Sequence, residues 1–527
     1  MNFNLADLFE RVADTVPERE ALVCGERRFT YAELDERATR LAHALADRGI
    51  SAGDHVGLWL HNDVEYLEGM LAAFKLRAVP INVNYRYVAD ELRYLFDDSR
   101  CRAVIHEADF APVLDDIRAD LPLLGVTIAK GDEYESALRD ASTVRDFPER
   151  SSDDLYILYT GGTTGMPKGV MWRQEDIFFG ALQGGDPGGP GIAKPELIAD
   201  SARNGGGRTF PACPLMHGTA HWVAFWTFFA GGTVVLSSAR RFEPADVLRV
   251  VADEQVSFLV IVGDAFARPL VDALAARKVM GGDAPDLSAL TAILSGGAIL
   301  SPSVKAALNE QLPATIVIDG FGASETGGQG RMVAAGETSD GPPRFAVDAQ
   351  TTVLDDDGRP VEPGSGVVGR LARRGRIPLG YWNDAEKTAR TFPTVDGVRW
   401  AVPGDLATLE ADGTVTVFGR GSVSINTGGE KVFPEEVESA LKAHPSVFDA
   451  VVVGVPDERW GERVAAVVQP RDGADASDLD VDELAAHCRR HLAGYKVPRS
   501  LVLVEEVVRS PSGKPDYRWA RARATQG

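Results

Sequence analysis

The sequence has few cysteines and a shortage of basic residues, and both deficits narrow the protein classes that it fits. The four cysteines, Cys24, Cys101, Cys213 and Cys488, are scattered and lack metal-site spacing, so reduced thiols in a cytoplasmic protein are expected. The 55 basic residues are outnumbered by 77 acidic ones, which gives a net charge of −22. This balance argues against general binding to nucleic acids or anionic membranes, so an anionic ligand would need local positive groups.

Long apolar runs are missing as well. The longest uncharged apolar run, residues 222–236, is shorter than the roughly 20 residues that span a bilayer, and Gly231 and Gly232 interrupt it. We expect a buried helix, a turn and a strand there. Residues 1–17 carry acidic residues among apolar ones, unlike a secretory signal. The sequence therefore predicts a cytoplasmic location and no integral membrane segment.

What is present fits a soluble enzyme of more than one domain. Apolar residues make up 44% and charged residues 25% of the 527 residues, and this length favours two or more domains. Strands are predicted at 56–60 and 78–83, and helices at 65–76 and 88–97. This alternation predicts an α/β fold with mostly parallel sheets flanked by helices. The Gly- and Pro-rich segment 184–208 is expected to be a loop or insertion.

The pattern restarts after residue 422. A helix at 434–443, strands at 447–453 and 463–468, a helix at 482–492 and a strand at 501–504 predict a small α+β unit. We therefore expect a large N-terminal domain of several subdomains, residues 1–419. A hinge at 420–422 and a C-terminal domain, residues 423–527, would follow it.

The strongest motif follows an apolar strand predicted at 155–158. It contains Thr160, Gly161, Gly162, Thr163, Thr164, Gly165 and Lys168. Glycines let backbone N–H groups approach an anion, and the threonines and the lysine add donors and charge, so the motif predicts a phosphate cradle. The alternative is a flexible surface loop. Because Gly169 rather than Ser or Thr follows Lys168, this is not the ordinary nucleotide-hydrolase loop, and a metal ligand must come from elsewhere.

A second motif follows the strand predicted at 316–318. It contains Asp319, Gly320, Phe321, Gly322, Ser324 and Glu325. Phe321 is suited to stacking on adenine, Ser324 to binding a phosphate oxygen, and Glu325 to holding Mg²⁺. The alternative for Glu325 is a solvated loop residue.

Weaker candidates lie elsewhere in the chain. Gly296, Gly297 and Ala298 follow a strand predicted at 290–294, where a flat ring could rest on the backbone, although a tight turn explains them equally well. Asp405, expected to be buried after a turn, is suited to binding two ribose hydroxyls. By composition alone, His217 is a core histidine and Lys514 a solvated lysine.

In their order and spacing these segments resemble the acyl-CoA synthetases of the adenylate-forming superfamily over nearly the whole chain. The resemblance runs through residues 160–169, 320–326, 404–405, 419–420, 428–431 and 513–514. A narrower resemblance, to actinobacterial ligases for steroid side-chain or other bulky terpenoid carboxylates, lies in residues 82–88, 169–172 and 419–438.

The resemblance implies a ligase that uses ATP, Mg²⁺ and coenzyme A to activate a small-molecule carboxylic acid. It assigns adenylation to Thr160, Gly161, Thr163, Thr164, Lys168, Ser324, Glu325 with Mg²⁺, and Lys514, and it places His217 beside the acyl pocket. It also implies that the C-terminal domain rotates at the hinge motif of Arg420, which brings Gly428, Gly429 and Glu430 to a channel for coenzyme A. The acid is expected to be polycyclic or long-chain, and a homo-oligomer is possible.

Two positions depart from the family pattern. Ser324 stands where threonine is usual, and Ser422 stands where the hinge commonly has Asp or Lys. Alternatives also stay open: an enzyme that performs one half-reaction or loads a carrier protein, a non-catalytic adenylate-binding protein and, more distantly, a luciferase-like oxygenase.

Overall fold

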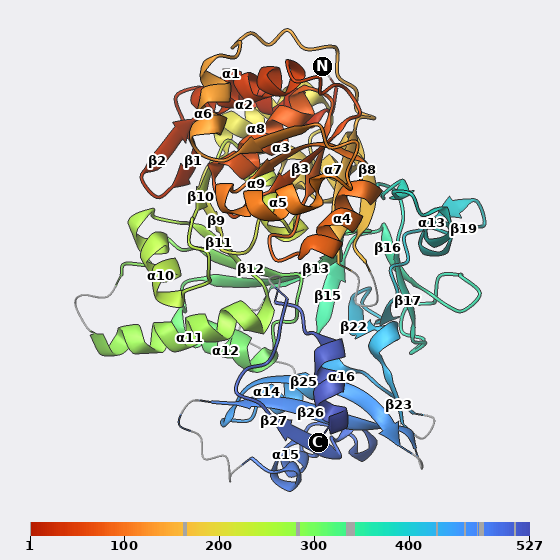
Figure 1. Cartoon of the computed structure of the whole chain (residues 1–527). Coiled ribbons are helices and arrows are strands. Elements are labelled where there is room, and N and C mark those ends of the chain that lie inside the picture. The colour runs from red at the N-terminus through yellow and green to blue at the C-terminus, as the bar shows by residue number, and fades with distance from the viewer. Residues whose placement is uncertain are drawn as a thin grey trace.

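The computed structural model describes residues 2–161, 166–280, 285–333, 343–427, 430–457, 460–471, 473, 479–510 and 513–526. Two bodies are visible (Figure 1). The larger one contains the N-terminus, and the smaller one, drawn in blue, contains the C-terminus and lies below α11 and α12. The predicted residues Gly162, Thr163, Thr164, Gly165, Gly428 and Gly429 lie outside the described ranges.

The larger body is organised around a 13-stranded sheet. Its strands lie in the order β16 (Thr351–Leu354), β17 (Gly369–Arg373), β21 (Asp405–Leu409), β22 (Val415–Arg420), β15 (Arg344–Val347), β14 (Gly327–Val333), β13 (Ile316–Ala323), β12 (Ala292–Gly296), β11 (Phe258–Ile261), β9 (Arg208–Pro211), β10 (Thr233–Leu236), β1 (Glu20–Cys24) and β2 (Arg27–Thr30). The strands from β13 to β1 are parallel. Those from β13 to β16 are antiparallel, as is the β1–β2 hairpin.

Three smaller sheets complete this body. One is wholly parallel, in the order β4 (Val79–Asn82), β3 (His55–Trp59), β5 (Cys101–His106) and β6 (Val126–Ala129). Another is antiparallel and consists of β18 (Gly380–Tyr381), β8 (Lys168–Arg173) and β7 (Leu155–Thr160). The last is the two-stranded hairpin of β19 (Thr394–Val395) and β20 (Val398–Arg399).

Helices connect most of the parallel strands, which confirms the predicted α/β class. They are α1 (Leu5–Thr15), α2 (Tyr31–Ala46), α3 (Val64–Lys75), α4 (Ala89–Asp98), α5 (Ala111–Arg118), α6 (Asp132–Arg139), α7 (Gln174–Gly180), α8 (Ile198–Asn204), α9 (Gly218–Phe229), α10 (Pro244–Asp253), α11 (Gly263–Met280), α12 (Pro302–Gln311) and α13 (Ala385–Thr391). Local sequence sets their ends: Thr30 and Glu33 form a capping box at the start of α2. The segment 184–208 is not only a loop, because α8 lies within it.

The smaller body has its own sheet and core. Its strands are β24 (Glu430–Val432), β23 (Ile425–Thr427), β26 (Gly461–Pro470), β25 (Val447–Asp457) and β27 (Ser500–Leu503), and its helices are α14 (Pro434–Lys442), α15 (Val481–Cys488) and α16 (Tyr517–Gln526). Side chains alternate between the two faces of β25. Val452 packs with α14 and α15, whereas Val451 packs with α16. These two clusters give the smaller body a core that is separate from that of the larger body.

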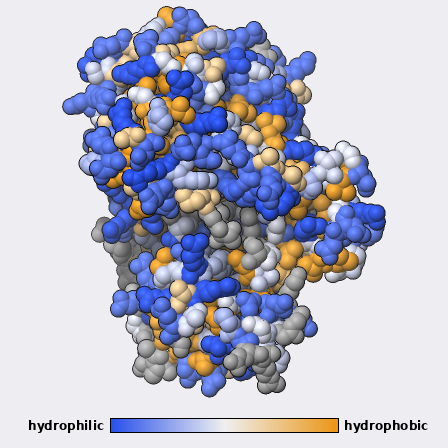
Figure 2. Space-filling model, turned by 45° about the vertical axis from the view of Figure 1, so that its right-hand side comes forward, coloured by the Kyte–Doolittle hydropathy of each residue, from blue (hydrophilic) through white to orange (hydrophobic). Residues whose placement is uncertain are grey.

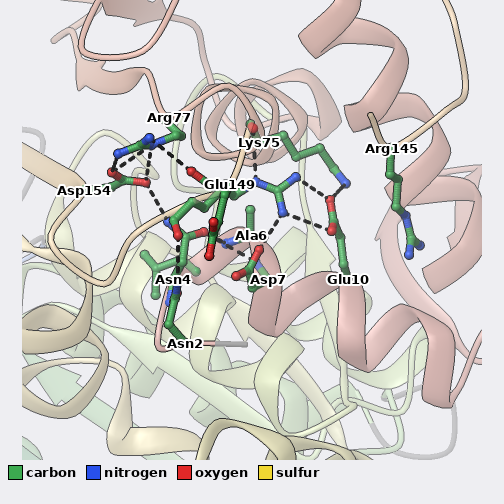
Figure 3. Close-up of polar contacts among 12 residues, drawn as sticks. Asn2, Asn4, Ala6, Asp7, Glu10, Lys75, Arg77, Arg145, Glu149 and Asp154 are labelled. Atoms are coloured by element: carbon green, nitrogen blue, oxygen red, sulfur yellow. Dashed lines mark hydrogen bonds and ion pairs between the residues drawn. The ribbon is translucent and has the colours of Figure 1, made fainter. Parts of the chain in front are cut away.

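A buried polar network braces the N-terminal end of the larger body (Figure 3). The side chain of Lys75, the last residue of α3, is fully buried and contacts Glu10 of α1 at 2.6 Å and Asp35 of α2 at 2.7 Å. Arg150 contacts Glu10 at 2.8 Å, and Arg77 contacts Asp154 at 2.8 Å. The network thus joins three helices to the connector that leads into β7.

The outer surface is largely hydrophilic. On the face shown in Figure 2, hydrophilic residues cover most of the surface, and hydrophobic ones are scattered among them. Among the described helices, none combines the length and apolarity required to cross a membrane.

Candidate functional site

The glycine-rich loop closes an antiparallel hairpin. Thr160, at the end of β7, pairs with Lys168, at the start of β8. Thr160 is half-buried and Gly161 is exposed. A strand follows the loop directly, so donors must come from the loop backbone and side chains rather than from the N-terminus of a helix. The run Lys168, Val170 and Trp172 was a usable signal for β8, because its side chains alternate.

Lys168 is held by a residue 216 positions later in the chain. Its ammonium group forms an ion pair with the carboxylate of Asp384, the N-cap of α13. The Asp384 side chain also accepts a hydrogen bond from the backbone N–H of Lys387. The hydrogen bond from Lys168 keeps the pKa of Asp384 below its usual value, mainly by stabilising the carboxylate. Lys168 is therefore oriented, while its side chain stays 33% exposed.

Glu325 lies against the same hairpin. Its side chain is buried, and its Oε1 accepts a hydrogen bond from the hydroxyl of Tyr381 at 2.7 Å. Tyr381 lies on β18, which pairs with Val170 of β8, and Trp172 of β8 donates to the carbonyl of Ser324 at 3.0 Å. The two motifs predicted separately are therefore joined. The sequence did not point to this role for Tyr381.

The donor set around Glu325 suits Mg²⁺ that arrives with a nucleotide. Proteins usually hold Mg²⁺ by one or two carboxylates together with substrate phosphates and water. Among the described residues, no group of three or more His, Cys, Asp or Glu side chains could hold a metal by itself. One fixed carboxylate, that of Glu325, beside the predicted phosphate-binding loop fits Mg²⁺ that is held jointly by the protein and a nucleotide.

The rest of the second motif lies on a strand rather than after one, because β13 continues to Ala323. The carboxylate of Asp319 forms a buried ion pair with Lys305 of α12 at 3.1 Å. Burial raises the pKa of Asp319 to about 6, although Lys305 opposes this rise. The ring centroid of Phe321 is 4.6 Å from that of Phe345. Both side chains therefore already have partners within the protein.

The glycines after β12 lie beside this strand. Gly296 pairs with Gly320 in the parallel register of β12 and β13. Gly297 has a φ of +90°, and a Cβ atom there would lie 3.3 Å from the Thr219 hydroxyl oxygen. A larger residue at 297 would therefore be strained and would crowd Thr219. Ala298, which follows, is half-buried.

His217 is connected to the hairpin through Asn82. The side-chain amide of Asn82 donates to the carbonyl of Tyr159 at 2.8 Å and to that of Met216 at 2.7 Å. These are the neighbours of Thr160 and His217. The Nε2 atom of His217 is buried and has no hydrogen-bond partner among the described residues. The sequence analysis missed Asn82 as a site residue, because only the folded chain places it between these segments.

Burial lowers the pKa of His217 to about 3, and the charge of Lys514 contributes. Lys514 lies in the turn between Arg509 and Pro515, which form an isolated bridge. In this turn Gly513 has a φ of +71°, and a Cβ atom there would lie 3.2 Å from both the Val262 carbonyl and the Ala265 Cβ atom. The turn of the smaller body therefore packs tightly against the larger body, on the side of His217.

The remaining candidates lie near the predicted hinge. Asp405 pairs with Arg420 between β21 and β22, and it is half-buried rather than buried as expected. Glu430, the first residue of β24, is exposed and pairs with Thr427. Within the described residues, no hydrogen bond or ion pair joins Glu430 to Glu325 or to His217.

Comparison with known proteins identifies the class of protein to which this fold and these motifs belong. Two family models match the chain: AMP-binding enzyme over residues 9–382, and AMP-binding enzyme C-terminal domain over residues 436–514. The chain therefore belongs to the AMP-binding enzyme family. This confirms the predicted superfamily and enzyme class.

Individual relatives agree with this membership. The 3-oxocholest-4-en-26-oate–CoA ligase of Rhodococcus rhodochrous is 50% identical, over 99% of this chain and 96% of that protein. The medium/long-chain-fatty-acid–CoA/3-oxocholest-4-en-26-oate–CoA ligase of Mycobacterium marinum is 49% identical, over 98% and 96%. Among solved structures, ATP-bound MatB from Rhodopseudomonas palustris superposes with a TM-score of 0.83 at 27% identity, covering 99% of each chain.

Proposed function

We propose that this protein is an acid–CoA ligase that forms an acyl-adenylate from a carboxylic acid and ATP, and then transfers the acyl group to coenzyme A. The observation that carries the proposal is the packing of the turn that contains Lys514 against Val262 and Ala265 of the larger body. The charge of Lys514 there helps to lower the pKa of His217, whose neighbour Met216 is joined to the glycine-rich hairpin through Asn82. Membership of the AMP-binding family and the CoA ligases among the relatives support it.

In the first half-reaction a carboxylate oxygen of the acid attacks the α-phosphorus of ATP. The new P–O bond replaces the bond to the bridging oxygen, and pyrophosphate leaves. Negative charge grows on the α-phosphate and on the leaving group, so fixed cations and N–H donors lower the barrier. We assign this role to the hairpin loop with Lys168, to Ser324 and to Lys514. Mg²⁺ at Glu325 would neutralise phosphate charge when bound.

In the second half-reaction the thiolate of coenzyme A attacks the acyl carbonyl carbon. The C–S bond forms, the bond to the phosphate oxygen breaks, and AMP leaves. Glu430 and its neighbours are assigned to the channel for the thiol arm. Because Glu430 is exposed and, among the described residues, forms no hydrogen bond or ion pair with Glu325 or His217, we infer that the C-terminal domain, residues 423–527, rotates about 420–422 between the two steps.

The acid is proposed to be a steroid side-chain acid, another bulky polycyclic acid or a long-chain acid. The activities of the Rhodococcus rhodochrous and Mycobacterium marinum relatives support this range. His217 is assigned to the acyl pocket, beside Thr219 and Gly297. The nucleotide contacts are proposed to include Gly296 to Ala298, residues 319–322, and Asp405 at the ribose. A cytoplasmic location and self-association are part of the same proposal.

Purified protein with ATP, Mg²⁺, coenzyme A and a panel of short, long-chain and polycyclic acids tests the proposal. Pyrophosphate release and a CoA thioester with at least one bulky or long-chain acid are expected. Pyrophosphate without a thioester would indicate an enzyme of one half-reaction or a carrier-protein loader. Absence of both, together with no ATP binding by calorimetry, would indicate a non-catalytic protein.

A variant separates the two steps. Lys514→Ala is expected to reduce pyrophosphate release by at least about 100-fold, because one stabilising donor is worth roughly 3 kcal/mol in such a transition state. Thioester formation from a supplied acyl-adenylate should change little. Equal losses in the two half-reactions, measured separately, would contradict the assignment.

A further inference from the structure

Three charged side chains are buried where the two bodies meet. Asp264 and Arg268 belong to α11 of the larger body, and Lys442 is the last residue of α14 in the smaller one. All three are buried, and Arg268 is 5% exposed. None of them belongs to a motif that the sequence analysis identified.

Asp264 and Lys442 form an ion pair at 2.8 Å, with side chains that are 5% and 4% exposed. Asp264 lies in the first turn of α11 and Lys442 in the last turn of α14, so each charge also complements the dipole of its own helix. Burial alone would raise the pKa of Asp264, but Lys442 and the backbone N–H of Ser301 lower it overall. The carboxylate is therefore the stable form at this boundary.

Arg268 adds two hydrogen bonds across the same boundary. It donates to the carbonyl of Lys442 at 3.0 Å and to that of Val447 at 3.5 Å. Carbonyls in the last turn of a helix lack partners within the helix, so an arginine suits this position. Through Arg268, helix α11 thus bonds to both the end of α14 and the start of β25.

A short series of contacts connects the start of β25 to the turn that contains Lys514. On β25, Asp449 accepts from Arg509 at 2.6 and 2.7 Å. Arg509 in turn donates to the carbonyl of Gly513 at 2.9 Å. Gly513 packs against Val262, which directly precedes α11, and against Ala265, which lies in the first turn of α11. Asp264 and Arg268, which bond to the smaller body, therefore lie next to Val262 and Ala265, which contact its turn.

A buried ion pair is weak evidence for stability, because desolvation offsets most of the attraction. It is demanding about geometry, however, because a small displacement leaves both charges buried without a partner. An apolar boundary would tolerate many orientations of the smaller body, whereas this one favours the orientation that aligns Asp264, Arg268 and Lys442.

We propose that Asp264, Arg268 and Lys442 form an interdomain latch that positions Lys514 for adenylation and opens before the thioester is formed. This inference rests on the proposed function and concerns the control of the same site. The three are positioning residues, since they act on the reaction through the orientation of Lys514. Opening exposes all three charges to water, which makes the latch reversible.

The test measures the two half-reactions separately in Asp264→Asn and Lys442→Met. Acid-dependent pyrophosphate release is expected to fall about 10-fold or more in each variant, equivalent to about 1.4 kcal/mol. Thioester formation from a supplied acyl-adenylate is expected to be unchanged or faster. The double variant should lose no more than the worse single one, because neither charge is then left without its partner.

Arg471→Ala is the matched control. Arg471 contacts Asp272 of α11 at 3.0 Å across the same boundary, but the side chains are 36% and 46% exposed. This exposed pair should change either half-reaction less than twofold. Losses as large as those of Asp264→Asn would mean that any interdomain contact matters equally, which would overturn the latch.

Equal losses in both half-reactions for Asp264→Asn, or no loss in either, would also overturn it. Lys442→Arg, which keeps the charge, should retain more adenylation than Lys442→Met and guards against a folding artefact. If the wild-type protein adenylates no acid, the proposed function fails, and hydrogen exchange then tests the latch separately. Asp264→Asn should speed exchange at the end of α14 more than Arg471→Ala does, and equal rates would contradict the latch.

Discussion

Three of the described lysines, Lys75, Lys305 and Lys442, are buried in ion pairs, and the surroundings of Lys75 and Lys442 differ in one respect. Lys75 contacts Glu10 (Figure 3) and also Asp35, within the N-terminal part of the larger body. Lys442 contacts Asp264 across the boundary between the two bodies. The chemistry is the same in each case, but only the second pair can separate without unfolding either body.

This difference determines what each pair can do. The helices that meet at Lys75 share one hydrophobic core, so its ammonium group stays buried for as long as the body is folded. Helices α11 and α14 contribute to different cores, and rotation of the smaller body would return Lys442 and Asp264 to water. Buried charge thus acts as permanent bracing in one place and as a reversible contact in the other.

The largest effect is expected at Lys75. Lys75→Met leaves Glu10 and Asp35 with only their arginine partners, and removal of one member of a buried pair typically costs about 3–5 kcal/mol. The free energy of unfolding should fall by roughly this amount. The ratio of the two half-reaction rates, measured below the new midpoint, should not change. Urea denaturation of the wild type and the variant measures the first quantity.

Lys442→Met supplies the contrast in that experiment. Its unfolding free energy should change by less than about half the Lys75→Met value, because Asp264 can rehydrate when the bodies separate. Its half-reaction ratio should shift, as described above. If Lys75→Met and Lys442→Met changed the unfolding free energy equally, or changed the ratio of the half-reaction rates equally, the two ion pairs would not differ in role.

The second largest effect is expected on the pH dependence of stability, and it comes from two buried histidines that form no ion pair among the described residues. Burial lowers the pKa of His217 to about 3 and that of His221 to about 4, below the value near 6.5 expected in the unfolded chain. The unfolded state therefore binds protons first as the pH falls. The contribution of these two histidines to stability should therefore decrease as the pH is lowered from 6.5 towards 4.

The carboxylates of the two buried pairs behave differently. Burial would raise the pKa of Glu10 and of Asp264, but their partners lower both below the ordinary values of 4.5 and 3.8. Their contribution is present above those values and is lost only at lower pH. His217→Gln should therefore flatten the decline between pH 6.5 and 4 in denaturation measured by fluorescence. An unchanged slope would mean that His217 does not titrate on unfolding.

Sequence patterns predicted much of the fold because local periodicity and turn chemistry determine it. The helices predicted at 65–76 and 88–97 and the valine-rich strands of the smaller body follow such patterns, and the structure contains them. The segment 184–208 was predicted to be a loop because glycines and prolines dominate its composition. The structure has helix α8 within it. Helix α16 carries many charges and was not predicted.

Sequence reasoning was weaker for the site, where partners are distant in the chain. Glycines, threonines and Glu325 stood out by type and spacing, whereas Asn82 and Asp384 did not, because only folding brings them to Met216 and Lys168. The latch is the extreme case. A charged residue at a helix end is ordinary in any sequence, and nothing local pairs Asp264 with Lys442.

The smallest effect is expected at the exposed counterpart of these pairs. Lys168 and Asp384 have side chains that are 33% and 23% exposed, so water screens their attraction. Asp384→Asn retains a side-chain oxygen to cap α13, and the unfolding free energy should change by less than about 1 kcal/mol. Because Lys168 loses its orienting partner, the KM for ATP should rise about threefold while kcat stays within about twofold. A large loss of kcat with an unchanged KM would mean that Asp384 stabilises the transition state. The partly exposed pair of Lys168 and Asp384 would then affect the rate of the reaction more than the buried pair of Asp264 and Lys442.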